Sequence, residues 1–370
     1  MRYASFFERL VETEIPHPEV LSVYYTVPLD PAEFDGVLPR VEHLVRQAAA
    51  DSGSRITLAD LRDTLAATRD WLGRGVAMFV AGANGLFERL KLPAPVDDTA
   101  MVGTRPYVRP LIAIGHRCPR YGIAVVDEAH AWIWPDDEPA EITAVTDEAL
   151  RKPNYAGWYG LSEYGVRSRA EGLRIRHYRR AAAEIRRFMR REGLDLLVLC
   201  GHDYEIPVFM EELPVDMRSK VSGVVAVDPR TLNPANMKPR TDPVIARRIA
   251  EYDENLAAAV VSDAATEKNA VTGLARCLAA VNARAVGTLL LDDGIRIRGA
   301  VCRGCGNLLE AGERACPDCD ADVRAVPDVL EEAAVAVLRS RGKVVPLPSG
   351  LLDGGPVAAR LRMPIAVFAH

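Results

Sequence analysis

The sequence predicts a mixed α/β protein of three domains, and three observations support this fold class. The chain has 370 residues and is 49% apolar, which suits domains of roughly 100–150 residues each better than one core. Short apolar runs typical of strands alternate with stretches of helical periodicity. Two proline-rich stretches interrupt this alternation. We therefore expect domains at 1–105, 106–230 and 231–370.

The first domain is expected to be a small α/β unit. Its strand-like runs cover 21–29 and 76–82, and helical patterns cover 34–50 and 58–72. The stretch TRPYVRP at 104–110 contains two prolines that interrupt regular structure, so we place the first boundary there.

The middle domain is predicted as strands with a helix between them. YGIAVVDEAHAWIW at 121–134 contains two short apolar strands around a polar turn, and further strands are expected at 194–201 and 221–228. A helix is expected at 172–191. Its apolar residues recur every three or four positions and so share one face: Ile175, Tyr178, Ala182, Ile185 and Met189.

The last domain is predicted as a further α/β layer. PRTLNPANMKPRTDP at 229–243 holds four prolines and is interpreted as the second linker. After it we expect helices at 244–264, 266–286 and 327–341, with strands at 287–293 and 343–347.

Two Cys-x-x-Cys pairs stand in CRGCGNLLEAGERACPDC, as Cys302, Cys305, Cys316 and Cys319. Each pair with its tight turn can direct two thiolates at one tetrahedral cation, for which zinc is the expected metal. Four thiolates close the coordination shell, so we expect one structural zinc ion per chain in a ribbon at 301–322. Cys118, Cys200 and Cys277 lie apart from this group and are interpreted as packing residues.

Basic charge is concentrated in one segment of an acidic chain. Residues 167–191 hold ten Arg and two acidic residues, a local formal charge of +8, whereas the whole chain has −5. A focused basic element on an acidic body is typical of contact with a polyanion. The alternative is a solvated arginine face.

A glycine- and aromatic-rich loop at 155–167 precedes the basic helix. Gly157 and Gly160 permit close backbone approach, and Trp158 and Tyr159 offer flat faces for stacking on bases. Arginines of the loop and helix could meet phosphates: Arg167, Arg169, Arg174, Arg176, Arg180 and Arg187. These ten residues are the predicted RNA-binding set. An ordinary surface loop is the alternative.

Asp-Glu-Ala-His at 127–130 is similar to the magnesium-binding box of helicases. That chemistry also needs a Gly-x-x-x-x-Gly-Lys-Ser/Thr phosphate loop, which the sequence does not contain. We therefore interpret these residues as a polar hairpin turn.

The order of these features resembles the bacterial branch of the archaeo-eukaryotic peptide-chain release factor superfamily, relatives of Pelota. The residues that carry the resemblance best are 106–134 and 157–191. It implies an RNase H-like middle domain, an L7Ae-like last domain with an inserted zinc knuckle pair, and binding in the ribosomal A site as a tRNA mimic. Contacts would be to rRNA of the A site and of the peptidyl-transferase centre.

One departure from that family concerns its catalytic loop. Release factors of this superfamily use a Gly-Gly-Gln loop to hydrolyse peptidyl-tRNA, and the corresponding positions here are about Gly160, Leu161 and Ser162. The sole glutamine of the chain is Gln47. The stretch 156–160, AGWYG, instead resembles the loop of Balon-type ribosome hibernation factors, which occupy idle ribosomes, with elongation factor Tu as an expected partner.

Three functions therefore remain open. We favour a non-catalytic ribosome hibernation or rescue factor; the alternative is a peptidyl-tRNA hydrolase that uses Ser162 or Glu163 with backbone amides. A zinc-ribbon protein acting away from the ribosome is the third class. We expect a cytoplasmic protein without a membrane contact, because no apolar run approaches the ~18–20 residues of a bilayer span. We also expect a monomer.

Overall fold

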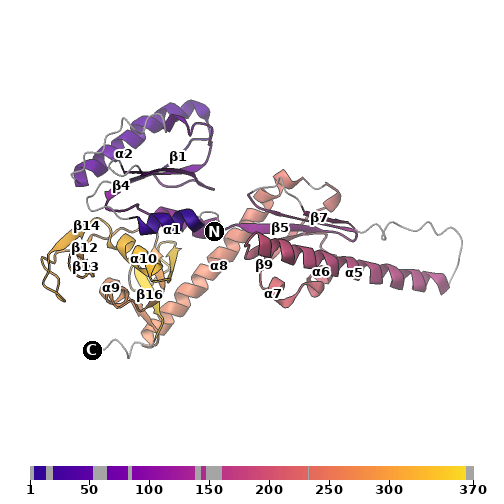
Figure 1. Ribbon diagram of the computed structural model, residues 1–370. Coiled ribbons are helices and arrows are strands. Elements are labelled where there is room, and N and C mark those ends of the chain that lie inside the picture. Colours follow the sequence, from indigo (N-terminus) through magenta and orange to yellow (C-terminus); the bar gives the residue numbers. More distant parts are fainter. Residues whose placement is uncertain are drawn as a thin grey trace. The chain divides into compact units, whose positions relative to one another are not determined.

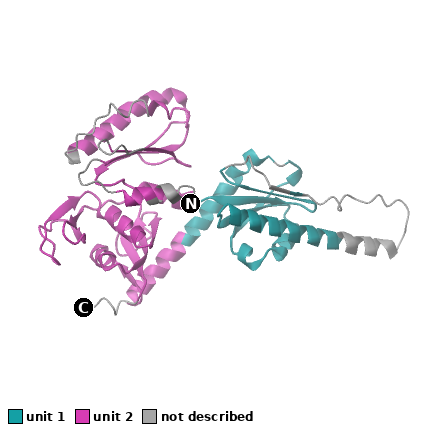
Figure 2. Ribbon diagram, viewed as in Figure 1, with its two compact units in different colours: residues 1–2, 119–252 teal, residues 3–118, 253–370 magenta. Residues whose placement is uncertain are grey.

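The computed structural model describes residues 4–13, 20–52, 65–81, 86–137, 143–146, 161–231 and 233–363. The chain forms two compact units (Figure 2). Unit 1 comprises residues 1–2 and 119–252, and unit 2 comprises residues 3–118 and 253–370. Unit 2 is thus built from both ends of the chain. Among the described helices, none is long and apolar enough to cross a membrane.

Unit 1 is built on a five-stranded mixed sheet with the order β7-β6-β5-β8-β9. β5, β8 and β9 are parallel, and β6 and β7 run antiparallel to their neighbours. The strands are β5 (Tyr121–Val126), β6 (His130–Pro135), β7 (Thr143–Thr146), β8 (Leu196–Gly201) and β9 (Val221–Ala226). The strands predicted at 121–134, 194–201 and 221–228 are confirmed.

Helices cover both faces of this sheet (Figure 1). Ala124 and Val126 of β5 share a core with α5 and α6, whereas Ile123 and Val125 pack with Ile245 of α8. A strand buried on both faces is apolar at every position, which explains the uninterrupted run in β5. The helices are α5 (Leu161–Arg191), α6 (Ile206–Glu212), α7 (Val215–Arg218) and α8 (Lys238–Ala265).

Gly122 of β5 allows α5 to lie close to the sheet. A Cβ atom at this position would stand 2.6 Å from Sδ of Met189, which is well inside van der Waals contact. The apolar face predicted for the helix is confirmed where it reaches the sheet, since Tyr178, Ala182, Ile185 and Met189 are buried.

α5 begins at Leu161, eleven residues earlier than predicted, so the second half of the expected loop at 155–167 is helical. The loop interpretation of this part was wrong. The helix continues through Gly165, since a single glycine inside a helix costs only about 1 kcal/mol relative to alanine and does not end it. In Figure 1 the first part of α5 continues well beyond the sheet.

α8 begins inside the predicted second linker and contains Pro243. Prolines near a helix start have a backbone angle that suits the helix, which is why proline content alone misplaced this boundary. Tyr121 holds the start of α8 against β5, because its hydroxyl lies 2.8 Å from Oγ1 of Thr241 and donates to Oδ1 of Asp242 at 2.7 Å. Lys238 lies over the same ring.

The first part of unit 2 contains an antiparallel sheet with the order β3-β2-β1-β4. Its elements are α1 (Ala4–Glu12), β1 (Val20–Thr26), α2 (Val37–Ser52), β2 (Gly75–Ala81), β3 (Leu86–Lys91), β4 (Thr99–Gly103) and α4 (Arg109–Arg117). The strands expected at 21–29 and 76–82 and the helix at 34–50 are confirmed. Residues 58–64 of the helix expected at 58–72 lie outside the described residues; of the remainder, 65–66 are helical and 67–70 form turns.

The second part of unit 2 contains a sheet with the order β10-β16-β11-β15, and a three-stranded sheet with the order β13-β12-β14. Its strands are β10 (Ala270–Thr272), β11 (Val286–Asp292), β12 (Gly299–Cys302), β13 (Leu308–Glu310), β14 (Val323–Val326), β15 (Lys343–Leu347) and β16 (Val357–Leu361). Its helices are α9 (Leu274–Asn282) and α10 (Val329–Arg339).

The helix expected at 266–286 is divided in the structure. β10 pairs antiparallel with β16 through Val271 and Thr272, and Gly273 with φ of 87° then leads into α9. The β-branched pair favours a strand once a neighbouring strand is present, which local helical periodicity does not reveal.

The stretch at 104–110 is buried between the two parts of unit 2. Val108 and Arg109 donate their backbone N–H groups to the carboxylate of Glu331 at 2.8 and 3.0 Å. Arg109 also donates to Oδ2 of Asp328 at 2.5 Å and to the Asp292 carbonyl at 2.9 Å. A carboxylate from α10 therefore satisfies N–H groups at the start of α4, where helices lack internal partners.

Glu331 is 6% exposed, and burial raises its pKa to about 8. The Asp328 charge acts in the same direction, while the two N–H donors and Arg109 oppose it. The pKa in the folded chain lies above the ordinary value of about 4.3. The folded state therefore binds more protons than the unfolded state at pH values between these two pKa values. The stabilising contribution of this group is full below pH ~4.3 and is lost as the pH rises toward about 8.

We predict that Glu331→Gln reduces this pH dependence. The free energy of unfolding of the parent should fall between about pH 5 and pH 8, whereas the variant should show a flatter profile because the titrating group is gone. Urea unfolding at several pH values measures both. Glu310→Gln, at an exposed position, is the matched control and should keep the parent's slope. Equal slopes for parent and Glu331→Gln would contradict the assignment.

Candidate functional site

The four cysteines form two knuckles with the same backbone structure. In the first, Cys302 N–H donates to the Asn307 carbonyl at 2.8 Å, and Gly306 N–H donates to the Cys302 carbonyl at 3.2 Å. In the second, Cys316 N–H donates to the Ala321 carbonyl, and Asp320 N–H donates to the Cys316 carbonyl, both at 2.9 Å. The residue after each pair is left-handed, with φ of 78° at Gly306 and 56° at Asp320.

The two knuckles bring the four sulfur atoms together. All lie within 4.8 Å of one another, with Cys302 and Cys319 sulfurs 3.4 Å apart and Cys305 and Cys316 sulfurs 3.6 Å apart. Sulfurs around a tetrahedral ion bound at about 2.3 Å would be about 3.8 Å apart. The arrangement therefore fits one tetrahedral metal ion. Each knuckle contributes one buried and one exposed cysteine.

The backbone also favours the charged form of a ligand. Cys302 accepts from the N–H groups of Cys305 and Gly304 at 3.4 and 3.3 Å. Led by the Cys305 N–H, these donors and the neighbouring thiols lower the pKa of Cys302 to about 6. A thiolate is the form that binds a metal.

The other three cysteines lie outside this site. Cys200 is in β8 and Cys277 is in α9, and burial raises the pKa of each thiol to about 12. A buried, protonated thiol is a poor nucleophile. Cys118 packs at the edge of the unit 2 core.

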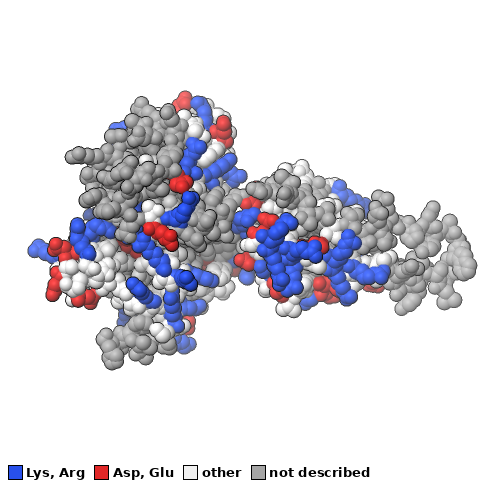
Figure 3. Space-filling view, viewed as in Figure 1, with Lys and Arg blue, Asp and Glu red and all other residues white. Residues whose placement is uncertain are grey.

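α5 carries exposed arginines on the faces directed away from the sheet, and Figure 3 shows basic side chains over this part of unit 1. Several take part in ion pairs with acids of α6, of the segment after it and of α5 itself: Arg179 with Glu212 at 2.6 Å, Arg186 with Asp216 at 2.9 Å, and Arg187 with Glu184 at 2.8 Å. Exposed pairs of this kind contribute little to stability, so a phosphate could replace the carboxylates at small cost.

The predicted RNA-binding residues are only partly described by the structure. Gly157, Trp158, Tyr159 and Gly160 lie outside the described residues, and Arg167 and Arg169 lie in α5 without described side chains. The structure brings the remaining four onto one helix: Arg174, Arg176, Arg180 and Arg187. The last three are exposed, and among the described residues Arg176 has no ion pair. Arg174 lies 3.7 Å from Glu128 and 3.5 Å from Glu171.

Asp127 organises the turn between β5 and β6. Its Oδ1 accepts from the N–H groups of Ala129 and His130 at 2.7 and 2.6 Å, and its own N–H donates to the His130 carbonyl. β5 and β6 pair antiparallel up to Val126 and Ala131. The polar hairpin turn predicted for Asp-Glu-Ala-His is confirmed.

A group of buried polar atoms lies near this turn, and one of its members, Glu205, was missed by the sequence analysis. Glu205 is 4% exposed, and burial, as the largest cause, raises its pKa. Its Oε2, the Tyr178 hydroxyl and Arg174 Nε have no hydrogen-bond partner among the described residues. The signal was Gly-His-Asp-Tyr-Glu directly after the apolar run of β8, where α/β sheets often place functional loops.

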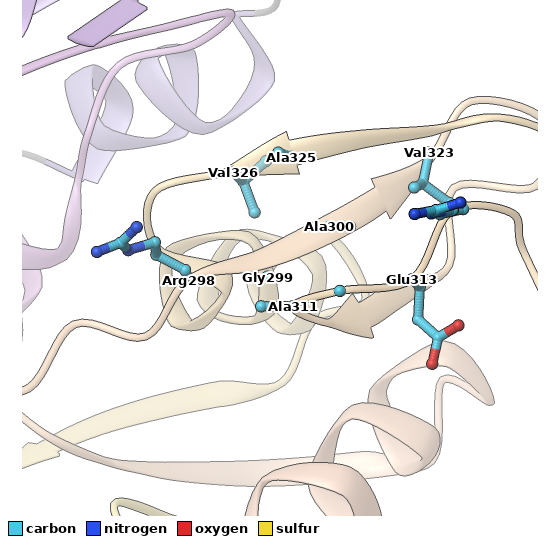
Figure 4. A pocket seen from close by; sticks show the side chains of 10 residues that line it. Arg298, Gly299, Ala300, Ala311, Glu313, Val323, Ala325 and Val326 are labelled. Carbon is cyan, nitrogen blue, oxygen red and sulfur yellow. The ribbon is translucent and has the colours of Figure 1, made fainter.

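A shallow hollow of about 380 Å³ lies on the three-stranded sheet beside the cysteines. Small residues of β12 and β14 line it, with Arg298 and Glu313 at its margins (Figure 4). No group of converging acids, bases and nucleophiles stands among its lining residues, so its surface does not have the composition of a catalytic cleft.

The middle of the chain matches a release-factor family model. Residues 106–236, which contain the entire sheet of unit 1, match a family of the bacterial branch of the archaeo-eukaryotic release factor superfamily. Its description is bacterial archaeo-eukaryotic release factor family 10. The predicted resemblance to this superfamily is thereby confirmed. No curated protein matches the chain.

Three solved structures show distant similarity. Dom34 of S. cerevisiae, described as a translation termination-like factor interacting with Hbs1, is 10% identical over 98% of this chain and 95% of that chain, with a TM-score of 0.43. Archaeal Pelota, from a ribosome-bound model with ABCE1, is 17% identical over 79% and 78%, with a TM-score of 0.42. The archaeal termination factor aRF1 is 16% identical over 98% and 97%, with a TM-score of 0.25.

We predict that Cys302→Ser and Cys316→Ser each abolish metal binding and lower the melting temperature of the chain. Both change a buried ligand, and the free energy of metal binding is coupled to folding at such sites. Elemental analysis of the purified protein and thermal unfolding test this. Cys118→Ser is the control and should keep the metal. Full metal content with an unchanged melting temperature in Cys302→Ser would exclude the site.

Proposed function

We propose that the chain is a release-factor-like protein that binds the ribosomal A site without hydrolysing peptidyl-tRNA, and that it protects or rescues idle or stalled ribosomes. One observation carries this proposal. The stretch 106–236 matches a release-factor family, yet the sole glutamine of the chain is Gln47, an exposed residue of α2 in unit 2. The family's Gly-Gly-Gln chemistry therefore has no glutamine in the loop that would carry it.

The geometry of α5 supports binding at a deep site. Its 31 residues make a helix about 46 Å long at about 1.5 Å per residue. Only the part from His177 onward contributes to the described core, and in Figure 1 the rest projects past the sheet. In the sequence, Trp158 and Tyr159 directly precede Leu161, where this basic helix begins. This is an arrangement suited to reaching along rRNA.

The remaining parts of the chain fit the same proposal. The sheet order of unit 1 supports an RNase H-like middle domain within 106–230, and the part after 231 would be the L7Ae-like domain. The four cysteines would hold one structural zinc ion, because a closed shell of thiolates leaves no coordination position for a substrate. Elongation factor Tu would be the partner that delivers the protein, and the compartment would be the cytoplasm.

We predict that ribosome binding depends on α5 and weakens steeply with salt. Reversal of Arg176, Arg180 and Arg187 to Glu should reduce the affinity for purified bacterial ribosomes and make the salt dependence shallower by about two to three units of slope, since each neutralised phosphate releases counterions. All three side chains are exposed, so the fold should persist.

Co-sedimentation at several salt concentrations measures this effect. The control is Arg247→Glu with Arg248→Glu, two exposed residues on α8 in the same unit, which should bind like the parent. If the triple variant binds as well as the parent at matched salt, α5 is only a solvated face.

We also predict that the loop acts by occupying its site. Stacking of Trp158 and Tyr159 on exposed bases would contribute about 1–3 kcal/mol per base, so Trp158→Ala should weaken ribosome binding by about tenfold. Purified protein should release no peptide from ribosomes loaded with peptidyl-tRNA, because no side chain in 156–166 replaces the glutamine amide. Peptide release that is lost on changing Ser162 or Glu163 would instead establish the hydrolase.

A further inference from the structure

Helices α9 and α10 end in the same backbone motif, with an arginine in an unfavourable conformation. Arg284 follows α9 with φ of 56°, and Arg341 follows α10 with φ of 61°. In both motifs two N–H groups bond back to carbonyls of the last turn: Arg284 to Val281 at 2.8 Å, Ala285 to Ala280 at 3.0 Å, Arg341 to Leu338 at 2.9 Å and Gly342 to Val337 at 2.8 Å.

This motif normally places glycine at the left-handed position, because a Cβ atom is strained there. The chain uses glycine in the same motif at the end of α5, where Gly193 has φ of 63°. α9 and α10 therefore carry arginine at a backbone cost that glycine would avoid. The reason for the two side chains must lie outside the local backbone.

The topology of the sheet brings these arginines to one edge. β11 starts directly after α9 and β15 directly after α10, and the two strands are parallel neighbours with Thr288 opposite Lys343. β16 runs antiparallel to β11 and ends at this edge, followed by Arg362. We call Arg284, Arg341, Lys343 and Arg362 the basic edge.

The basic edge is exposed and positively charged. All four side chains are exposed, and among the described residues none of them has an ion pair. Within the described part of the chain, the Arg362 guanidinium donates to the backbone carbonyls of Val286 and Ser340. Of the acids at this end of the sheet, Asp263 is paired with Lys268 at 3.8 Å and Arg360 at 3.4 Å, and Glu267 stands at the end of α8.

Stabilisation of the helix ends does not account for this arrangement. A cation in the last turn interacts favourably with the helix dipole, and Arg339 of α10 already supplies one without a strained backbone. Lys343 is in a strand and Arg362 directly follows one, so a helix dipole does not explain their positions. A function for the group as a whole is required.

We propose that the basic edge binds phosphate groups of RNA. Arginine presents a planar set of donors that matches phosphate oxygens, and a focused basic site on a chain of net charge −5 attracts a polyanion locally. A protein partner is less well matched, because Met363 is the sole large apolar side chain exposed here among the described residues. The inference rests on the proposed ribosome binding and adds a second RNA contact in unit 2.

The double variant Arg284→Gly and Arg341→Gly tests this proposal in the full chain. Glycine suits both backbone positions, so the melting temperature should stay within about 3 °C of the parent or rise. Affinity for a fluorescently labelled RNA duplex, measured by anisotropy, should fall about tenfold, and the salt dependence should become shallower by about two units of slope. Affinity for purified bacterial ribosomes should fall in the same direction.

Glu267→Gly is the matched control, since it makes the same change at a left-handed residue after a helix but removes an acid. It should bind RNA as well as the parent or better. Lys343→Glu is a second variant that leaves both helix ends intact and should also weaken RNA binding. The proposal would be overturned if the double-glycine protein is folded and binds the duplex with the parent's affinity and salt slope. It would also be overturned if this variant loses ribosome binding while its duplex binding is unchanged.

The two proposals fail separately in this experiment. A parent that does not bind ribosomes, but whose duplex binding depends on the basic edge, would refute the proposed function and support the basic edge. If the parent binds ribosomes through α5 and the basic edge contributes to binding of neither ribosomes nor the duplex, the basic edge is refuted and the proposed function is supported.

Discussion

The contact on which unit 2 depends is the carboxylate of Glu331 with two backbone N–H groups at the start of α4. Together with the pair of Arg109 and Asp328, it joins the first part of the chain to α10 in a buried setting. Removing one partner of a buried polar contact is costly, because the other partner stays out of water without a substitute. The shared apolar core can form only if these polar groups make their hydrogen bonds and ion pair with one another.

The sequence predicted what local patterns encode and missed what distant partners decide. β5 and β8 were visible because burial on both faces makes every residue apolar, and the knuckles were visible because metal geometry fixes the Cys-x-x-Cys spacing. Residues 104–110 looked like an interruption, since their partner Glu331 lies more than 200 positions away. β10 was missed for the same reason, because it is a strand only beside β16.

The charges on α5 also show that a local sequence pattern does not reveal distant partners. Ten arginines between 167 and 191 were countable, but the pairing of Arg179 and Arg186 with Glu212 and Asp216 follows from the packing of α5 beside α6 and α7. The basic edge could not be counted at all, because its four residues come from three separate segments. Backbone angles at Arg284 and Arg341 reveal it, and no local pattern specifies those angles.

The insertion of unit 1 between the two parts of unit 2 sets an order for folding during synthesis. Tyr24, Leu111 and Ile112 belong to a core that also contains Leu289 and Val335. The ribosome must therefore complete unit 1 and continue well into the last third of the chain before that core can close. At about 5–20 residues per second the nascent first part waits on the order of ten seconds, which is long enough for unit 1 to fold first.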